Sequence, residues 1–282
     1  MISFIHQLGW ELYRMFARPR TYIGFGIFLL FELFFYLLWS REKSGIEKFI
    51  NQLSGGAEEY FSAITFGFLI LIATMFLLGV ISVSLVSGDI VAKETEDGNL
   101  RLLLARPVSR IRLLTIKFIS CQIYTLVLFL FVGVSALAFG VMSRGWGGGF
   151  LVWAPDLPKV SLFSWGEGLI RYFGSVVVFS LFYLPVSGIA FCLSCLKIKP
   201  AAAAIIPVGV ILADSILHKI PLPIMDDFRP YLMTERINGW LYIFYENIPW
   251  AKLLESAAWL VGFGLSGFVL GCVVFLRRDI KS

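Results

Sequence analysis

The chain has 282 residues, of which 58% are hydrophobic and only 15% are charged, with a mean hydropathy of +0.83. Soluble domains carry about 25% charged residues, so the composition excludes an ordinary soluble protein, and the net charge of +5 gives no reason to expect nucleic acid as a partner. Several apolar runs approach or exceed the roughly 20 residues that a helix needs to cross a bilayer. The sequence therefore predicts an all-α, multi-pass membrane protein that forms one transmembrane domain over residues 1–282.

Residues 1–18 are predicted to form an interfacial helix. Apolar residues recur at helical spacing, at Phe4, Leu8, Leu12 and Met15. A polar stripe has the same spacing and consists of Gln7, Glu11, Arg14 and Arg18. Two such stripes are typical of a helix that lies in the membrane plane with its basic side toward the headgroups. A frayed cytosolic tail is the alternative.

Six apolar runs follow, and each is predicted to span the membrane. They cover residues 21–39, 62–86, 115–142, 169–196, 201–217 and 254–275. The fifth contains Pro207, which a spanning helix tolerates when neighbouring groups satisfy the freed carbonyl. Six spans place both termini on one side. The segments on that side are the shorter ones, yet they hold more lysine and arginine near the span ends, so the positive-inside rule places both termini in the cytoplasm.

Two long loops fall on the outer side, at residues 143–165 and 218–252. The second loop contains Ile220-Pro-Leu-Pro-Ile224 and an apolar, aromatic run at 241–248, and neither is long enough to span. Three interpretations stay open for these runs: they dip into the outer leaflet, cap the bundle, or pack on it as ordinary loop. Glu167 and Arg171 are spaced i, i+4 at the start of the fourth span, which predicts a local ion pair.

The sequence contains no motif of a common enzyme class. It has no H-E-x-x-H, no G-x-S-x-G and no Walker loop, so the chain is expected neither to be an enzyme nor to bind ATP by that loop. Its two histidines, His6 and His218, fall on opposite sides of the membrane, which argues against a histidine metal site. Cys192 and Cys195 lie in an apolar run, where two small residues at i, i+3 indicate close helix packing. We expect no metal and no cofactor on this chain.

Two carboxylates fall inside predicted spans. Glu32 is near the middle of the first span, and Asp214 is toward the outer end of the fifth. An ionisable group at this depth is costly, so it normally faces the bundle interior or a water-filled path. Both are candidates for a substrate path. The alternatives are a structural hydrogen bond to a neighbouring span and, for Asp214, a side chain that snorkels to the surface.

Residues 87–117 form a dense charged interruption between two apolar runs. The second span is predicted to continue through Lys93 into the cytosol. Asp97-Gly98 is a turn signal, and Asp97 or Asn99 can cap a new helix. That helix, at about 99–105, ends at Arg106 because the residue before Pro107 avoids helical geometry. Ser109 can then cap the third span.

Leu100, Leu103 and Leu104 form an apolar face on this short helix. An exposed apolar face with charged residues around it indicates a docking surface. The plain alternative is a charged cytosolic loop that merely obeys the positive-inside rule.

The same stretch resembles the signature of the type-2 permeases of ABC transporters. It reads Glu94-Thr-Glu96-Asp97-Gly98-Asn99-Leu100-Arg101-Leu-Leu103-Leu104-Ala-Arg106-Pro107-Val-Ser-Arg110 and closes at Lys117. The family usually has threonine where this chain has Asn99, and both residues cap helices. The closing run from Phe275 to Ile280 also resembles the family's C-terminal edge. With six spans and an N-terminal interfacial helix, the resemblance covers the whole chain.

The resemblance implies the membrane subunit of an ATP-driven exporter in the bacterial cytoplasmic (inner) membrane. Two copies, or this chain and a related permease, would pair in the bilayer. Each would rest its short helix, the coupling helix, on a separate ATP-binding subunit that holds ATP and Mg. An extracytoplasmic accessory protein is a further possible partner.

The resemblance also implies which residues meet the ATP-binding subunit. They are Glu94, Glu96, Asp97, Gly98, Asn99, Leu100, Arg101, Leu103, Leu104, Arg106, Pro107 and Arg110. The three leucines of the apolar face would fill a cleft in that subunit, and charged residues would set the register at its rim. Two other functions remain open. The chain could be an ABC-type scaffold that passes ATP-driven motion to an extracytoplasmic partner, or a stand-alone secondary transporter.

Overall fold

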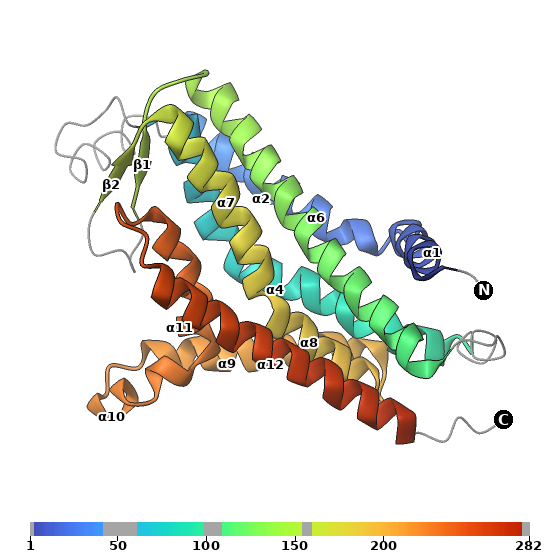
Figure 1. Cartoon of the computed structure of the whole chain (residues 1–282). Helices are drawn as coiled ribbons and strands as arrows, with labels where there is room; N and C mark the ends of the chain where they lie inside the picture. The colour runs from blue at the N-terminus through green and yellow to red at the C-terminus, as the bar shows by residue number, and fades with distance from the viewer. Residues whose placement is uncertain (1–2, 42–60, 99–108, 154–159, 278–282) are drawn as a thin grey trace.

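The computed structural model describes residues 3–41, 61–98, 109–153 and 160–277. Within these ranges, six helical segments are long and apolar enough to cross a membrane (Figure 1). They are α2 (Thr21–Arg41), α4 (Ala63–Glu96), α6 (Arg110–Arg144), α7 with α8 (Trp165–Phe182 and Leu184–Ser194), α9 (Pro200–Lys219) and α12 (Trp250–Arg277). A separate short helix, α1 (Phe4–Phe16), precedes them. The predicted all-α membrane fold is confirmed.

Two of these helices are much longer than the apolar runs that predicted them. α4 has 34 residues and α6 has 35, so each is about 50 Å long at 1.5 Å per residue. The hydrocarbon core is only about 30 Å thick, so both helices project well beyond it. Each apolar run indicates only the part of its helix that lies within lipid. The helices themselves continue through the charged residues next to these runs. Ser109 caps α6 as predicted, its Oγ accepting from Arg112 N at 3.3 Å.

The fourth span is two helices, not the single one expected over 169–196. α7 ends at Phe182 and α8 begins at Leu184. Pro185 lies in the first turn of α8 and has no N–H to donate to α7, so it ends the first helix. In α9, by contrast, Pro207 leaves the helix unbroken.

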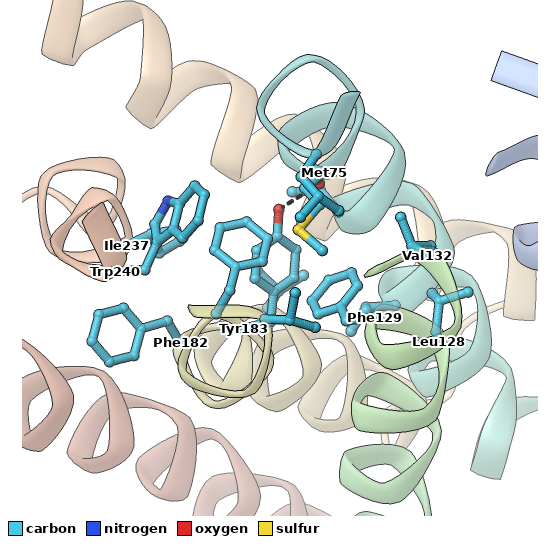
Figure 2. Packing of buried hydrophobic residues seen from close by; sticks show 14 of the residues in the cluster. Met75, Leu128, Phe129, Val132, Phe182, Tyr183, Ile237 and Trp240 are labelled. Carbon is cyan, nitrogen blue, oxygen red and sulfur yellow. Dashed lines mark hydrogen bonds between the residues drawn. The ribbon is translucent and has the colours of Figure 1, made fainter. Parts of the chain in front are cut away.

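The core forms around α4, which packs on α2, α6, α8 and α9. Figure 2 shows part of this core, where the ring of Tyr183 lies beside Phe129. Tyr183 is the residue between α7 and α8. The Tyr183 hydroxyl donates to Met75 O at 2.9 Å and to Phe76 O at 3.0 Å. An internal hydroxyl therefore satisfies carbonyls of α4 at the point where the fourth span changes helix.

Small residues let helices approach closely in two places. α8 and α12 meet at Gly188 and Gly264, where a Cβ on Gly188 would lie 2.6 Å from Gly264 O. Further along the same pair, a Cβ on Gly271 would lie 3.2 Å from Cys192 Cα and 3.4 Å from Cys195 Sγ. The prediction that the two cysteines mark close helix packing is confirmed.

The outer end carries a layer of short elements. An antiparallel pair of strands, β1 (Phe150–Val152) and β2 (Ser161–Phe163), was not predicted. After α9 come α10 (Pro223–Asp226), η2 (Arg229–Tyr231), α11 (Met233–Asn238) and η3 (Gly239–Phe244). In η3, the side chains of Leu241 and Phe244 are buried, so of the three interpretations of the apolar run at 241–248 the structure supports capping of the bundle.

Arg171 holds this layer to α7. Its guanidinium donates to Ile243 O at 2.6 Å and to Tyr245 O at 2.8 Å, and it pairs with Glu167 at 2.7 Å. The predicted ion pair is confirmed, and its second function, as an anchor for the outer layer, was not foreseen.

Candidate functional site: charged residues at the inner ends of α4 and α6

The residues expected to meet a partner are only partly described. Glu94 and Glu96 lie in the last turn of α4, Asp97 and Gly98 follow it, and Arg110 begins α6. Seven others lie outside the described residues: Asn99, Leu100, Arg101, Leu103, Leu104, Arg106 and Pro107. Gly98 has a φ of 73°, a left-handed geometry that favours glycine after a helix. The predicted turn at Asp97-Gly98 is therefore present.

A buried lysine and a buried glutamate lie beside this turn. The Lys117 side chain is 0% exposed and that of Glu94 is 2% exposed. Lys117 Nζ lies 2.7 Å from Glu94 Oε2 and 2.7 Å from Glu11 Oε1. Since the three residues belong to α6, α4 and α1, their ion pairs connect three helices at one point.

Two arginines complete the cluster, Arg14 in α1 and Arg18 in the turn that follows it. Arg14 pairs with Glu94 and also lies 3.3 Å from Glu11. Arg18 lies 3.5 Å from Glu94. We call these five residues (Glu11, Arg14, Arg18, Glu94 and Lys117) the α1 charge network. Glu94 is the counter-ion shared by all three cations, so its carboxylate fixes α1 against both α4 and α6.

The network also keeps Glu11 ionised. Burial alone would raise the pKa of Glu11, but the charges and hydrogen bonds of Lys117 and Arg14 outweigh burial and hold that pKa below its usual value. The carboxylate is therefore negative at neutral pH and available to both cations.

The position of α1 corrects one prediction. Its basic stripe was expected to face the headgroups, but Glu11, Arg14 and Arg18 turn toward the bundle, and Met15 is buried. Ile5, Trp10 and Tyr13 are large apolar side chains of the helix that are exposed. Helical spacing finds the two stripes, but it does not show that Glu94 and Lys117 supply counter-charges from elsewhere. That α1 lies in the membrane plane stays a prediction.

Exposed ion pairs surround the network. Arg20 lies 3.2 Å from Asp89, and Lys93 lies 2.8 Å from Glu96 and 3.1 Å from Asp97. A cavity of about 360 Å³ opens between α4 and the turn that joins α1 to α2. Met15, Val86 and Ile90 supply apolar parts of its wall, and Arg18, Asp89 and Lys93 supply charged parts. Each of these three charged residues already has a partner of opposite sign.

The two carboxylates proposed for a substrate path have different surroundings. Glu32 is 0% exposed, and neither of its oxygens has a hydrogen-bond partner among the described residues, although the Ser135 side chain lies beside it. Asp214 accepts hydrogen bonds from Met233 N at 3.1 Å and Thr234 N at 2.7 Å. Asp214 therefore holds the start of α11 to α9. Glu32 remains a buried polar group whose role these contacts do not account for.

No group of three or more His, Cys, Asp or Glu residues could hold a metal ion within the described ranges. The candidate site in this part of the chain is therefore an arrangement of ion pairs. What it can do chemically is fix the relative positions of three helices beside the turn that leads out of α4.

Each member of the network stands out in the sequence, but the pairing of these residues was not predicted. Lys117 was noted only for the motif, and Glu94 only as a partner contact. One signal was available: Lys117 is preceded by Ile116 and followed by Phe118 within an apolar helix, and a lysine buried there requires a negative partner. The residues around Lys117 in the sequence do not indicate which glutamate supplies the negative charge.

The chain was compared with models of protein families. The model of a family described as "ABC-2 family transporter protein" matches residues 11–206, which is more than half of the chain. The matched region contains the whole α1 charge network and the segment between α4 and α6. A search of curated proteins found no match.

Proposed function

The chain belongs to the ABC-2 transporter family, and from this premise we propose that it is the permease of an ATP-driven exporter, coupled to its ATPase through residues 94–110. Members of this family are multi-pass membrane transport subunits that associate with an ABC ATP-binding subunit and are not themselves enzymes. ATP and Mg are then held and consumed by that partner. A second copy of the chain, or a related permease, completes the membrane part in the bacterial inner membrane.

The observation that carries the proposal is the length of α4 and α6. These two long helices project past the hydrocarbon core and are joined by the segment at 97–109. A push on that segment acts directly on both helices. Because α4 packs on α2, α6, α8 and α9, its tilt would reach most of the bundle. This geometry supports transmission of motion from the cytosolic side through α4 and α6 to the other spans.

The α1 charge network supports the same function. Glu94 is three residues before Asp97, and Lys117 is two turns into α6. Their ion pairs with α1 hold the inner ends of α4 and α6 together. A force on the connecting segment would then move both helices instead of separating them. We keep Glu32 as a proposed contact on the substrate path, because it is buried and lacks a hydrogen-bond partner among the described residues. We no longer propose Asp214 for the substrate path, because its carboxylate accepts hydrogen bonds from the start of α11.

The test is a charge placed on the apolar face of the coupling helix. Leu103→Glu should abolish co-purification of the ATP-binding subunit, or the ATPase stimulation that the permease gives it, because a carboxylate would have to enter an apolar cleft. Leu102→Glu is the matched control, since helical spacing of 100° per residue places it on the opposite side from Leu100, Leu103 and Leu104. Membrane insertion of both variants is checked by their level in the membrane fraction.

Normal assembly and normal ATPase stimulation in Leu103→Glu would reject the coupling assignment. Equal loss in both variants would show that added charge, and not the apolar face, disturbs the complex.

A further inference from the structure

The carboxyl of Glu32 lies inside the bundle, about halfway along the first span. α2 begins at Thr21 and has 21 residues, so at 1.5 Å per residue Glu32 is about 16 Å along a helix of about 32 Å. Its side chain is 0% exposed, whereas Leu30 and Phe34 on the same helix are exposed to 67% and 59%. Glu32 therefore turns away from the lipid and toward α4 and α6, on which α2 packs.

The helices around Glu32 carry their charges at other depths. The charged residues of α4 begin at Asp89, toward its inner end. On α6, the described cations nearest to Ser135, the neighbour of Glu32, are Lys117 and Arg144, about 27 Å and 14 Å away along the helix. Arg144 lies over two aromatic rings at the outer end, and the charged residues of α1 form the α1 charge network. In the part of the chain that the structure describes, no positive charge faces the Glu32 carboxyl.

The polar neighbours of Glu32 have lone pairs to offer but have already used their protons. They are the hydroxyls of Ser135 on α6 and Tyr172 on α7. Ser135 Oγ donates to Phe131 O at 2.9 Å, and the Tyr172 hydroxyl donates to Gly133 O at 2.8 Å. Such hydroxyls can still accept a hydrogen bond, which a protonated carboxyl can donate and a carboxylate cannot. The surroundings of Glu32 therefore suit its protonated form.

A proton also fits this environment better than a metal cation does. Ca²⁺ takes six to eight oxygen ligands, and Mg²⁺ requires a near-octahedral set. The described polar groups at this point are one carboxyl and two hydroxyls, which are too few to replace the water around such an ion. One oxygen is enough for a proton, and a protonated carboxyl avoids the cost of an unpaired charge at membrane depth.

We propose that Glu32 is a proton-binding site within the membrane and that its carboxyl is protonated at neutral pH. The bound proton takes the place of the counter-ion that the neighbouring helices do not supply. The inference deepens the proposed place of Glu32 on the substrate path, because a neutral carboxyl offers a substrate a hydrogen-bond donor instead of a negative charge. It rests on the chain spanning a membrane and not on coupling to an ATPase.

The experiment is infrared difference spectroscopy on the full chain in lipid nanodiscs at neutral pH. Carboxyls in water are ionised at this pH, so absorption by a protonated carboxyl reports a group in unusual surroundings. We expect this band in the wild type and its loss in Glu32→Gln, with no loss of carboxylate absorption. Asp214→Asn is the matched control, since each variant adds one side-chain amide. Two backbone amides donate to Asp214 and favour its charged form, so this variant should lose carboxylate absorption and keep the protonated band.

Loss of carboxylate absorption in Glu32→Gln would overturn the proposal, because Glu32 would then be ionised. A protonated band that stays unchanged in this variant would assign the proton to another residue. Absence of the band from the wild type would also overturn the proposal, whether or not the variants fold. If Glu32→Gln does not insert, Glu32→Asp keeps an acid at this position and should shift the band, whereas an unchanged band would again assign it elsewhere. The nanodiscs contain no ATPase, so none of these results tests the coupling assignment.

Discussion

At the scale of single residues, the distinctive feature is a carboxylate shared by three cations. Glu94 pairs with Lys117, Arg14 and Arg18, and both Glu94 and Lys117 are almost entirely buried. Buried ion pairs add little net stability over apolar packing, but removing one partner is strongly destabilising because the other charges stay buried and unpaired. The network therefore specifies where α1 docks more than it stabilises the fold.

We predict that Glu94→Gln lowers the free energy of unfolding by about 3–5 kcal/mol, the usual cost of breaking a buried pair. Glu96→Gln is the matched control two residues away. Its partner is Lys93, and both side chains are partly exposed, so we expect a much smaller loss, because solvent screens an exposed ion pair. Thermal unfolding in detergent measures both variants. Equal losses would show that burial of Glu94 has no energetic consequence.

At the scale of elements, the close approach of α4 to α9 depends on Gly88. A Cβ at this position would lie 2.7 Å from Ala204 N and 2.8 Å from Ala203 C. These are backbone atoms, so a side chain cannot be accommodated by a change of rotamer. α9 would have to move away from the central helix of the bundle.

Gly88→Ala is therefore expected to destabilise the protein by about 1–3 kcal/mol, the range for overpacked sites. Gly209→Ala, in α9 itself, is the control, because a Cβ there meets nothing within 4 Å and alanine favours a helix by roughly 0.5–1 kcal/mol over glycine. The two unfolding temperatures should move in opposite directions. A neutral Gly88→Ala would mean that the two helices are not held at this separation.

At the scale of the whole molecule, the six spans place α1 and the end of α12 at one end of the bundle. Figure 1 shows both near the inner ends of α4 and α6, while β1, β2 and α11 lie at the other end. The charged residues of the α1 charge network are at the first end, and the outer layer of short elements is at the second. This polarity agrees with the orientation that the positive-inside rule predicts.

We predict that reporters fused to the N-terminus and the C-terminus both report the cytoplasm, whereas a reporter inserted after Gly147 reports the outside. Gly147 has a φ of 110°, and a Cβ there would meet nothing within 4 Å, so an insertion directly after it should disturb little. Paired fluorescent-protein and alkaline-phosphatase fusions measure the side. Termini on opposite sides would require an odd number of spans and would invalidate the six-span topology.

The sequence by itself determined several features that depend on local pattern. Apolar length found the six spans, helical spacing found the Glu167–Arg171 pair, and cap and turn residues located Ser109 and Gly98. The signature between Glu94 and Lys117 pointed to the family that residues 11–206 match. These signals are readable because each involves residues only a few positions apart.

Only the tertiary structure decided which face of α1 meets the bundle, where the fourth span breaks its helix, and how the outer loops are arranged. Lys117 contacts Glu11, which is 106 positions away in the sequence, and Arg18 contacts Glu94, which is 76 positions away. A stripe of charge looks the same in the sequence whether it faces headgroups or counter-ions. The difference arises when α4 and α6 bring a buried glutamate and a buried lysine to the same point, because neither charge can remain there unpaired.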